Sequence, residues 1–283
     1  MRLGRKALPE QTMPAVPPTK YSVLKFRIKR AARRMLWPHP SVYYPIGLLR
    51  KRGNVFDHDA ELYMGGYPRS GNSFSRFAFL TANPTVKVYS HQHIPSFVLR
   101  QVEYKIPGLI LIRTPLDAAV SWAIHQNQSL EEAVAYWNDY YETLLPVRSE
   151  LFLARFNDVT TDFGGVMKAF NLRWGTSYTL FDHTPENAAQ CFRLTEEDYR
   201  KSNGKLCEMQ VCRPSPERHL VKQAHLEQLE QSSFLRDELA RASELYEKYV
   251  HPAPVNGRQS STRLIPASNE SREALSVGVT RVS

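Results

Sequence analysis

One short stretch, residues 62–74 (LYMGGYPRSGNSF), constrains the fold of this chain more than any other. Its first residues are apolar and suit a buried strand, and its last residues suit the first turn of a helix. Between them, Gly66 and Gly71 bound a loop that is followed by Asn72 and Ser73. This is the spacing of a loop whose backbone N–H groups surround a phosphate at a helix N-terminus. The alternative is an ordinary strand–turn–helix connection rich in small residues.

The positive charge of this loop is in an unusual place. In loops that bind Mg-ATP, the position of Asn72 holds a lysine that reaches the terminal phosphates. That lysine is absent here, and Arg69 within the loop supplies a positive charge instead. The stretch therefore predicts a phosphate-binding loop that is poorly suited to Mg-ATP.

Strands and helices are expected to alternate through most of the chain. Short apolar runs predict strands at 61–65, 86–89, 108–112 and 151–156. Periodic apolar residues predict helices at 72–81, 96–103, 115–126, 130–147 and 161–170, and a helical segment at 217–249 with a break near Ser232-Ser233. Residues 176–212 are expected to be rich in loops. This order predicts an α/β fold with a central parallel sheet in a three-layer α/β/α arrangement.

The positive charge of the chain is concentrated near its first residue. The 283 residues have a net charge of +9, but residues 1–52 contain 13 Lys or Arg and one acid, a net charge of +12. The rest of the chain therefore carries about −3, the difference between these two values. We expect residues 1–52 to form a basic, partly disordered extension, residues 53–250 a single α/β domain, and residues 251–283 a disordered tail.

Residues 21–37 of the extension interleave apolar side chains with Lys and Arg, which predicts a basic amphipathic helix. Three roles remain open for it: docking on the domain, contact with an acidic partner, or peripheral contact with an anionic membrane surface. No base-reading or RNA-binding motif accompanies the helix, so nucleic acid is not expected as a partner.

The number of cysteines bears on the cellular compartment in which the protein is expected. The three cysteines, Cys191, Cys207 and Cys212, cannot form a complete disulfide framework, and this count fits a reducing compartment. None of them belongs to a zinc-binding pattern, so no metal site is expected. No apolar run reaches the length of about 18 residues that a membrane-spanning helix needs, and no secretory signal is recognised. We therefore expect a cytoplasmic protein, with peripheral membrane contact through 21–37 as the open alternative.

Three distant parts of the chain are expected to meet at one edge of the sheet. In parallel sheets, ligands bind beyond the carboxyl ends of the strands, where the 66–73 loop, the histidines His91 and His93, and Arg113 should lie. A Mg-dependent phosphotransferase would place an acid at such a strand end, whereas an arginine suits metal-free recognition of a phosphate. Ser121, eight residues after Arg113, offers a hydroxyl to the same anion. The alternative is that Arg113 pairs with a nearby acid and Ser121 is an ordinary helix residue.

These residues resemble the motifs of the PAPS-dependent sulfotransferases, which use 3′-phosphoadenosine 5′-phosphosulfate (PAPS) without a metal. Their 5′-phosphosulfate loop reads roughly Y-P-K-S-G-T-T-W, and this chain has YPRSGNSF at 67–74. Their 3′-phosphate motif, R-x-P-x-D-x-x-x-S, is matched at every fixed position by Arg113, Pro115, Asp117 and Ser121. Looser similarities lie at Ser90-His91, at 156–159 and at 213–218. The resemblance covers about residues 61–175.

The resemblance implies a P-loop-containing nucleotide hydrolase-like fold and a sulfotransferase activity. PAPS would be the co-substrate, PAP the product, and the acceptor a small molecule or glycan with a hydroxyl or amine. No metal is implied. The implied site residues are, for binding, Pro68, Arg69, Ser70, Gly71, Asn72, Ser73, Phe74, Arg113, Ser121, Phe156 and Arg213, and, for catalysis, His91, Arg69 and His93.

The chain departs from the family pattern in ways that matter for the chemistry. Arg69 replaces the usual lysine, which keeps the charge but changes its reach. Phe74 and Phe156 stand where the family commonly has Trp and Tyr, so stacking on adenine is possible but the Tyr hydroxyl contact is lost. His91 matches the family context better than His93, and both remain candidates for the base. Two other functions stay open: a P-loop-type nucleotide kinase, and a non-catalytic membrane- or partner-binding protein.

Overall fold

The computed structural model describes residues 20–49, 59–207 and 218–251. Its centre is a sheet of four parallel strands in the order β2-β1-β3-β4. The strands are β1 (Leu62–Gly66), β2 (Val88–Gln92), β3 (Gly108–Ile112) and β4 (Phe152–Arg155). The chain leaves β1 toward β2 on one side and returns to β3 on the other, so the loops after β1 and β3 adjoin at the carboxyl edge of the sheet.

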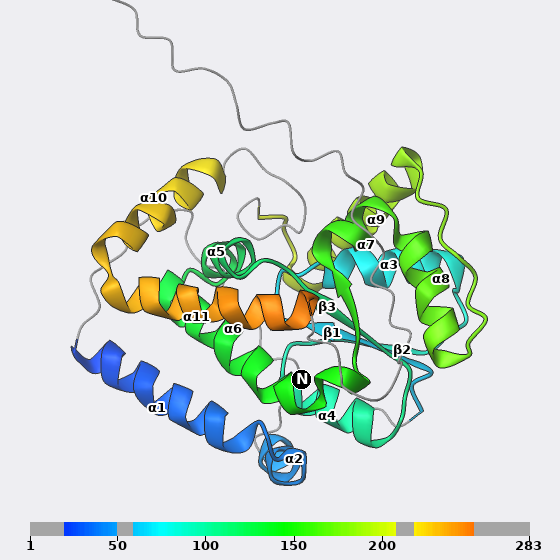
Figure 1. The fold of residues 1–283 in the computed structure, drawn as a ribbon. Helices are drawn as coiled ribbons and strands as arrows, with labels where there is room; N and C mark the ends of the chain where they lie inside the picture. Colours follow the sequence, from blue (N-terminus) through cyan, green and yellow to red (C-terminus); the bar gives the residue numbers. More distant parts are fainter. Residues whose placement is uncertain (1–19, 50–58, 208–217, 252–283) are drawn as a thin grey trace, which may run out of the picture.

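Helices make up most of the remaining described structure (Figure 1). They are α1 (Lys20–Leu36), α2 (Pro40–Leu49), α3 (Asn72–Ala82), α4 (Pro95–Glu103), α5 (Pro115–Gln126), α6 (Leu130–Leu144), α7 (Phe156–Thr161), α8 (Phe163–Trp174), α9 (Pro185–Asn203), α10 (Arg218–Gln231) and α11 (Ser233–Val250), with a 3-10 helix η1 (Leu145–Glu150) after α6. None of these helices is long and apolar enough to cross a membrane.

The two faces of the sheet bury two separate hydrophobic cores. Because side chains alternate along a strand, Leu109 and Leu111 of β3 face one core while Ile110 and Ile112 face the other. The first core contains buried side chains of α3, α7, α8 and α9, and the second those of α4, α5, α6 and α11. Figure 1 shows these two groups of helices on opposite sides of the strands. The α/β class with an all-parallel sheet is confirmed, and helices on both faces are compatible with three layers.

Most elements match their sequence expectation, with a few differences. The strand expected at 86–89 lies at 88–92, so that His91 belongs to β2 rather than to the loop after it. The segment 176–212, expected to be rich in loops, contains the 19-residue helix α9. Helices α2 and α7 were not expected, and Phe156, expected in the strand 151–156, is the first residue of α7. The break near Ser232 is confirmed, since α10 ends at Gln231 and α11 begins at Ser233.

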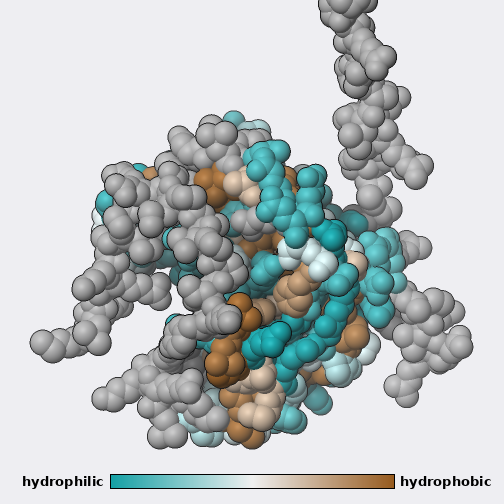
Figure 2. All heavy atoms as spheres, turned by 90° about the vertical axis from the view of Figure 1, so that its left-hand side faces the viewer, coloured by the Kyte–Doolittle hydropathy of each residue, from teal (hydrophilic) through white to brown (hydrophobic). Residues whose placement is uncertain are grey.

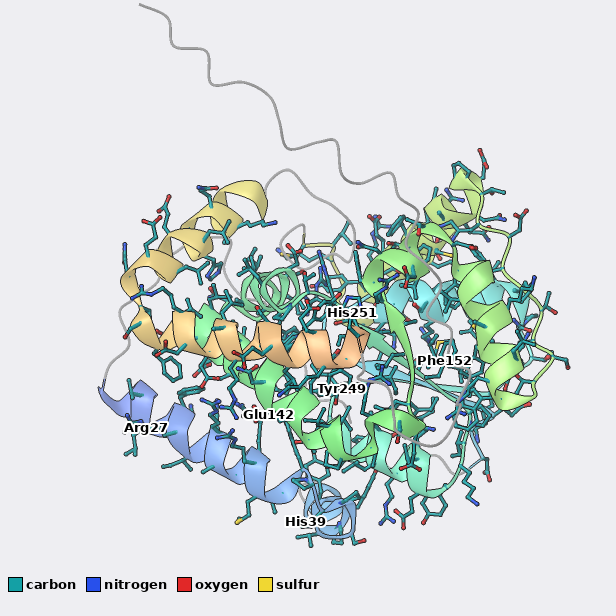
Figure 3. The ribbon with its side chains drawn as sticks, viewed as in Figure 1. Arg27, His39, Glu142, Phe152, Tyr249 and His251 are labelled. Atoms are coloured by element: carbon teal, nitrogen blue, oxygen red, sulfur yellow. The ribbon has the colours of Figure 1, made fainter. Side chains whose placement is uncertain are left out.

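The basic helix α1 packs on the domain through ion pairs. The Asp139 carboxylate of α6 is fully buried and accepts from Arg30 (3.2 Å) and Arg33 (3.0 Å) of α1. Arg30 also forms two hydrogen bonds with Glu238 of α11, at 3.0 and 2.8 Å. Figure 3 shows Glu142, a further partner of α1, in the space between α1 and α11. Docking on the domain, one of the three roles left open for residues 21–37, is therefore what the structure shows for this face of the helix.

The expected boundary at residue 52 and the disorder expected at both ends stay predictions. Residues 1–19, 50–58, 208–217 and 252–283, including the site candidate Arg213, lie outside the described part of the chain.

Candidate functional site

The loop between β1 and α3 is fixed by its glycines and by one asparagine. Gly71 precedes α3 with φ 96°, and a Cβ there would lie 3.2 Å from Val159 Cγ2, so both backbone and space favour glycine. The buried side chain of Asn72 donates from Nδ2 to the Tyr67 carbonyl at 3.1 Å. Asn72, which takes the place of a Walker lysine, therefore stabilises the loop from inside.

Helix α3 begins at this loop without a side-chain cap. The residue before the helix is Gly71, which has no side chain to accept from the first turn, and its carbonyl accepts from Ser75 N. The N–H groups of a first turn lack intrahelical acceptors, and the helix dipole adds a partial positive charge there. The start of α3 is thus suited to an anion, with Ser73 beside it.

Two arginines lie next to this helix start. Arg69 Nε donates to Ser121 Oγ at 3.0 Å, and Arg113 Nη1 donates to the Arg69 carbonyl at 3.2 Å. Arg69 has φ 65°, a conformation that costs a non-glycine residue free energy and is concentrated at functional sites. The Arg113 guanidinium stacks over the Phe156 ring, 4.1 Å from its centroid. Two cations from the segments that follow β1 and β3 are therefore held near one another, and the Ser121 hydroxyl on α5 contacts one of them, Arg69.

The acid whose charge acts on Arg113 is Asp117, and it also has two other partners. Asp117 accepts from Thr114 Oγ1 at 2.8 Å and forms an ion pair with Lys222 of α10 at 3.4 Å. Burial lowers the pKa of Arg113 below its ordinary value, the Asp117 charge raises it, and the Arg69 charge lowers it further. The two guanidiniums thus repel one another in a partly desolvated place, and an anionic ligand would relieve that repulsion.

His91 reaches the site through a distortion of β2. Met64 of β1 pairs with Ser90 while Gly65 pairs with Gln92, so His91 is an extra residue in the register, with φ 63°. Its Nε2 lies 3.2 Å from Ser73 Oγ and its Nδ1 lies 3.1 Å from Ser90 Oγ. His91 is an exposed residue that lines the cavity. Desolvation by the protein around its ring, and then the charges of His93 and Arg76, nevertheless lower the pKa of His91 well below its ordinary value.

His93 lies beside the end of β1. Its Nδ1 is 3.0 Å from the Gly66 carbonyl, which can only accept, so Nδ1 carries the proton and Nε2 keeps its lone pair. Burial lowers the pKa of His93, the hydrogen bond to Gly66 raises it, and the Arg69 charge lowers it. Tyr136 of α6 donates to the His93 carbonyl and fixes the backbone there. Both histidines are therefore neutral near pH 7.

One cavity of about 650 Å³ joins these features. Its volume lies within the range of roughly 300–1,000 Å³ that is typical of small-molecule sites. It is lined by eleven of the candidates from the sequence, namely Pro68, Arg69, Gly71, Asn72, Ser73, Phe74, His91, His93, Arg113, Ser121 and Phe156. Ser70, a residue of the same loop, is fully buried and does not line the cavity.

Part of the cavity wall comes from residues that the sequence did not place at the site. Phe192, Glu196 and Tyr199 of α9 line it, as do Trp122 of α5 and Lys222 of α10. For the α9 residues a sequence signal exists at the start of the helix, where Pro185 follows Thr184, whose side chain accepts from Asn187 N. A helix start alone does not indicate which surface the helix covers.

The two phenylalanines expected to stack on a base are placed differently. Phe74 is buried, and its ring packs against Phe192 and His183 with centroids 5.5 Å from each, so it serves the core as well as the cavity wall. One face of Phe156 is covered by Arg113. A planar ligand could therefore contact the remaining edge of Phe74 or the other side of Phe156.

Comparisons of this chain with protein-family models, with curated proteins and with solved structures found no match. Among the described residues, no group of three or more His, Cys, Asp or Glu side chains is placed to hold a metal ion.

Proposed function

We propose that this protein is a PAPS-dependent sulfotransferase with a P-loop-like fold. The observation that carries the proposal is a pair of arginines in one cavity near the start of α3: Arg69 donates to Ser121, and Arg113 donates to the Arg69 carbonyl. This donor set is made of planar cations and backbone N–H groups, which recognise phosphate and sulfate oxygens by bidentate hydrogen bonds. The family resemblance of residues 67–74 and 113–121 supports the same ligand.

The residues present fit PAPS as the co-substrate. The N–H groups at the start of α3, with Arg69 and Ser73, would hold the 5′-phosphosulfate end. Arg113 and Ser121 would hold the 3′-phosphate, and Phe74 and Phe156 would contact the adenine from the sides that remain open. When bound, PAPS would supply an activated sulfuryl group for transfer to an acceptor hydroxyl or amine of a small molecule or glycan.

The chain's own residues would contribute charge stabilisation and proton transfer. Arg69 and the loop amides are placed to stabilise negative charge on a leaving phosphate, and such preorganised donors are typically the largest catalytic effect. A neutral histidine is able to accept the proton of the acceptor as its oxygen or nitrogen bonds to sulfur. General-base help of this kind is typically worth about 10²–10⁴-fold in rate.

We assign the role of general base to His91 in preference to His93. The contact between His91 Nε2 and Ser73 Oγ places this ring beside the start of α3, where a transferable group would be held. His93 has the better-defined tautomer, with Nε2 unprotonated, and is the second candidate. His91→Ala should abolish turnover while PAP affinity is retained; loss of turnover only in His93→Ala would reverse the assignment.

Calorimetry on the full chain separates a sulfotransferase from a P-loop-type kinase. We expect PAP to bind without Mg²⁺ and at least about tenfold more tightly than Mg-ATP, because one charged hydrogen bond is worth about 1.5–3 kcal/mol. A higher affinity for Mg-ATP than for PAP, dependent on Mg²⁺, would support the kinase instead.

Turnover is then measured with labelled PAPS and a panel of sugars, phenols and amines. Transfer of label to an acceptor supports the proposal. Tight PAP binding with no transfer to any acceptor would favour the non-catalytic alternative.

A further inference from the structure

Helix α1 has two chemically different faces, and the domain covers only one of them. The inner face carries Arg30 and Arg33 in the ion pairs with α6 and α11, and Phe26, whose ring meets Phe234 edge-on at 6.4 Å. The buried Trp37 just beyond the helix packs in the same core. These contacts fix the rotation of α1 about its own axis, so the outward residues are determined.

The outward face is an apolar stripe. Leu24, Ile28 and Met35 expose 57%, 60% and 67% of their surface, and Ala31 between them is exposed as well. Steps of four, three and four residues place these side chains on one side of a helix, opposite the inner face. In Figure 2, hydrophobic residues reach the surface among hydrophilic ones in the lower half of the view, at the height of α1. Three large exposed apolar side chains in one row are unusual for a surface helix.

Basic side chains border this stripe. Lys25 and Lys29 lie along one edge and Arg27 along the other, and all three are exposed. Helix α1 contains no acidic residue. Its positive charges therefore divide into an inner set, neutralised by Asp139, Glu142 and Glu238, and an outer set that faces away from the domain.

We propose that the outward face of α1, defined as Leu24, Lys25, Arg27, Ile28, Lys29, Ala31 and Met35, binds the surface of an anionic lipid bilayer. An apolar row between cationic edges matches a helix that lies in the interface plane, with its apolar side chains among the acyl chains and its cations at the headgroups. The inference is independent of the proposed sulfotransferase activity.

Charge argues against two other occupants of this face. A second copy of the chain would bring the same cationic edges into contact, and like charges repel. Segments 1–19, 50–58 and 252–283 of the chain each carry a net charge of +2, and segment 208–217 carries only −1, so none of them offers an acidic surface. An anionic lipid surface supplies both the apolar and the acidic partner.

The test is co-sedimentation of the full chain with vesicles of pure phosphatidylcholine and with vesicles that also contain phosphatidylserine. We expect binding to the anionic vesicles only, weakened by salt because the charges are exposed. Lys25→Glu/Arg27→Glu/Lys29→Glu and, separately, Leu24→Gln/Ile28→Gln/Met35→Gln should each reduce the partition by roughly tenfold or more. Since all six side chains point outward, both variants should keep the wild-type thermal transition.

A matched control moves the same charge change to another exposed surface. Lys168→Glu/Arg193→Glu/Lys201→Glu should reduce the partition much less than the α1 variant. If the control variant and the α1 charge variant lost vesicle binding equally, net charge alone would explain the effect, and the proposal would be overturned. Equal binding to neutral and anionic vesicles would also overturn the proposal. A concentration-dependent dimer in light scattering that both α1 variants abolish would overturn it too, since a second copy of the chain would then occupy this face.

Discussion

At the scale of single residues, Arg113 carries the most testable part of the proposed site. Its guanidinium is oriented by the Arg69 carbonyl and by the Phe156 ring, a geometry that an ammonium group cannot reproduce. We predict that Arg113→Lys lowers PAP affinity by about tenfold or more, measured by calorimetry without Mg²⁺. Arg100→Lys on α4, away from the cavity, is the matched control and should bind PAP normally. Wild-type affinity in Arg113→Lys would remove this residue from the site.

The lowered pKa of His93 predicts how the stability of the protein depends on pH. The folded protein lowers the pKa of His93 below the ordinary 6.5, so at acidic pH the unfolded chain takes up this proton more readily than the folded one. The stability tied to neutral His93 is complete above pH about 6.5 and is lost as pH falls from there through the lowered pKa.

The measurement is the free energy of unfolding in urea between pH 8 and 5. We expect it to fall less steeply in His93→Gln, which stays neutral and keeps a donor for the Gly66 carbonyl. An identical slope in both proteins would mean that His93 titrates normally in the fold.

The sequence predicted only part of the arrangement of the site residues. The loop spacing and the strand end placed Arg69 and Arg113 at one edge of the sheet, because carboxyl ends of parallel strands meet there. That Arg69 donates to Ser121 was not predictable, since it depends on the left-handed backbone of Arg69 and the rotation of α5. The register shift that turns His91 toward Ser73 also leaves no trace in a single sequence.

At the scale of elements, the α1–α6 contact depends on one buried carboxylate. The Asp139 side chain is fully buried, with Arg30, Arg33 and Arg34 of α1 around it. Removing one partner of a buried ion pair leaves charge without compensation, which typically costs about 3–5 kcal/mol. We predict a loss of this size in the free energy of unfolding of Asp139→Asn. Glu142→Gln is the control: this carboxylate is 27% exposed and should cost below about 1 kcal/mol.

The elements that the sequence did not reveal are those with weak apolar patterns. Helix α9 buries only Cys191 and Thr195 among its 19 residues, so its period is nearly invisible beside its many polar side chains. Helix α2 contains Pro45 within its ten residues, and proline is ordinarily a sign against a helix interior. Strands such as 108–112 were predictable because burial on both faces requires a continuous apolar run.

At the scale of the whole molecule, the N-terminal helix and the site are joined through α6. One side of α6 holds Asp139 against α1, while its Ala133 carbonyl accepts from Tyr67 Oη in the loop between β1 and α3. Tyr136 of the same helix donates to the His93 carbonyl. An element that anchors α6 therefore also supports the loop and the histidine segment, which is why a deletion of α1 is not a clean test of membrane contact.

Deleting residues 1–36 should accordingly weaken both the fold and ligand binding. The deletion leaves the carboxylates of Asp139 and Glu238 buried without Arg30 and exposes the surface of α6 that faces α1. We expect a lower thermal midpoint and weaker PAP binding, measured on one preparation by calorimetry and by circular dichroism. Deletion of 1–19 removes none of the contacts described for α1 and is the matched control. If the longer deletion kept the wild-type midpoint and PAP affinity, α1 would be an appendage whose only role lies on its outward face.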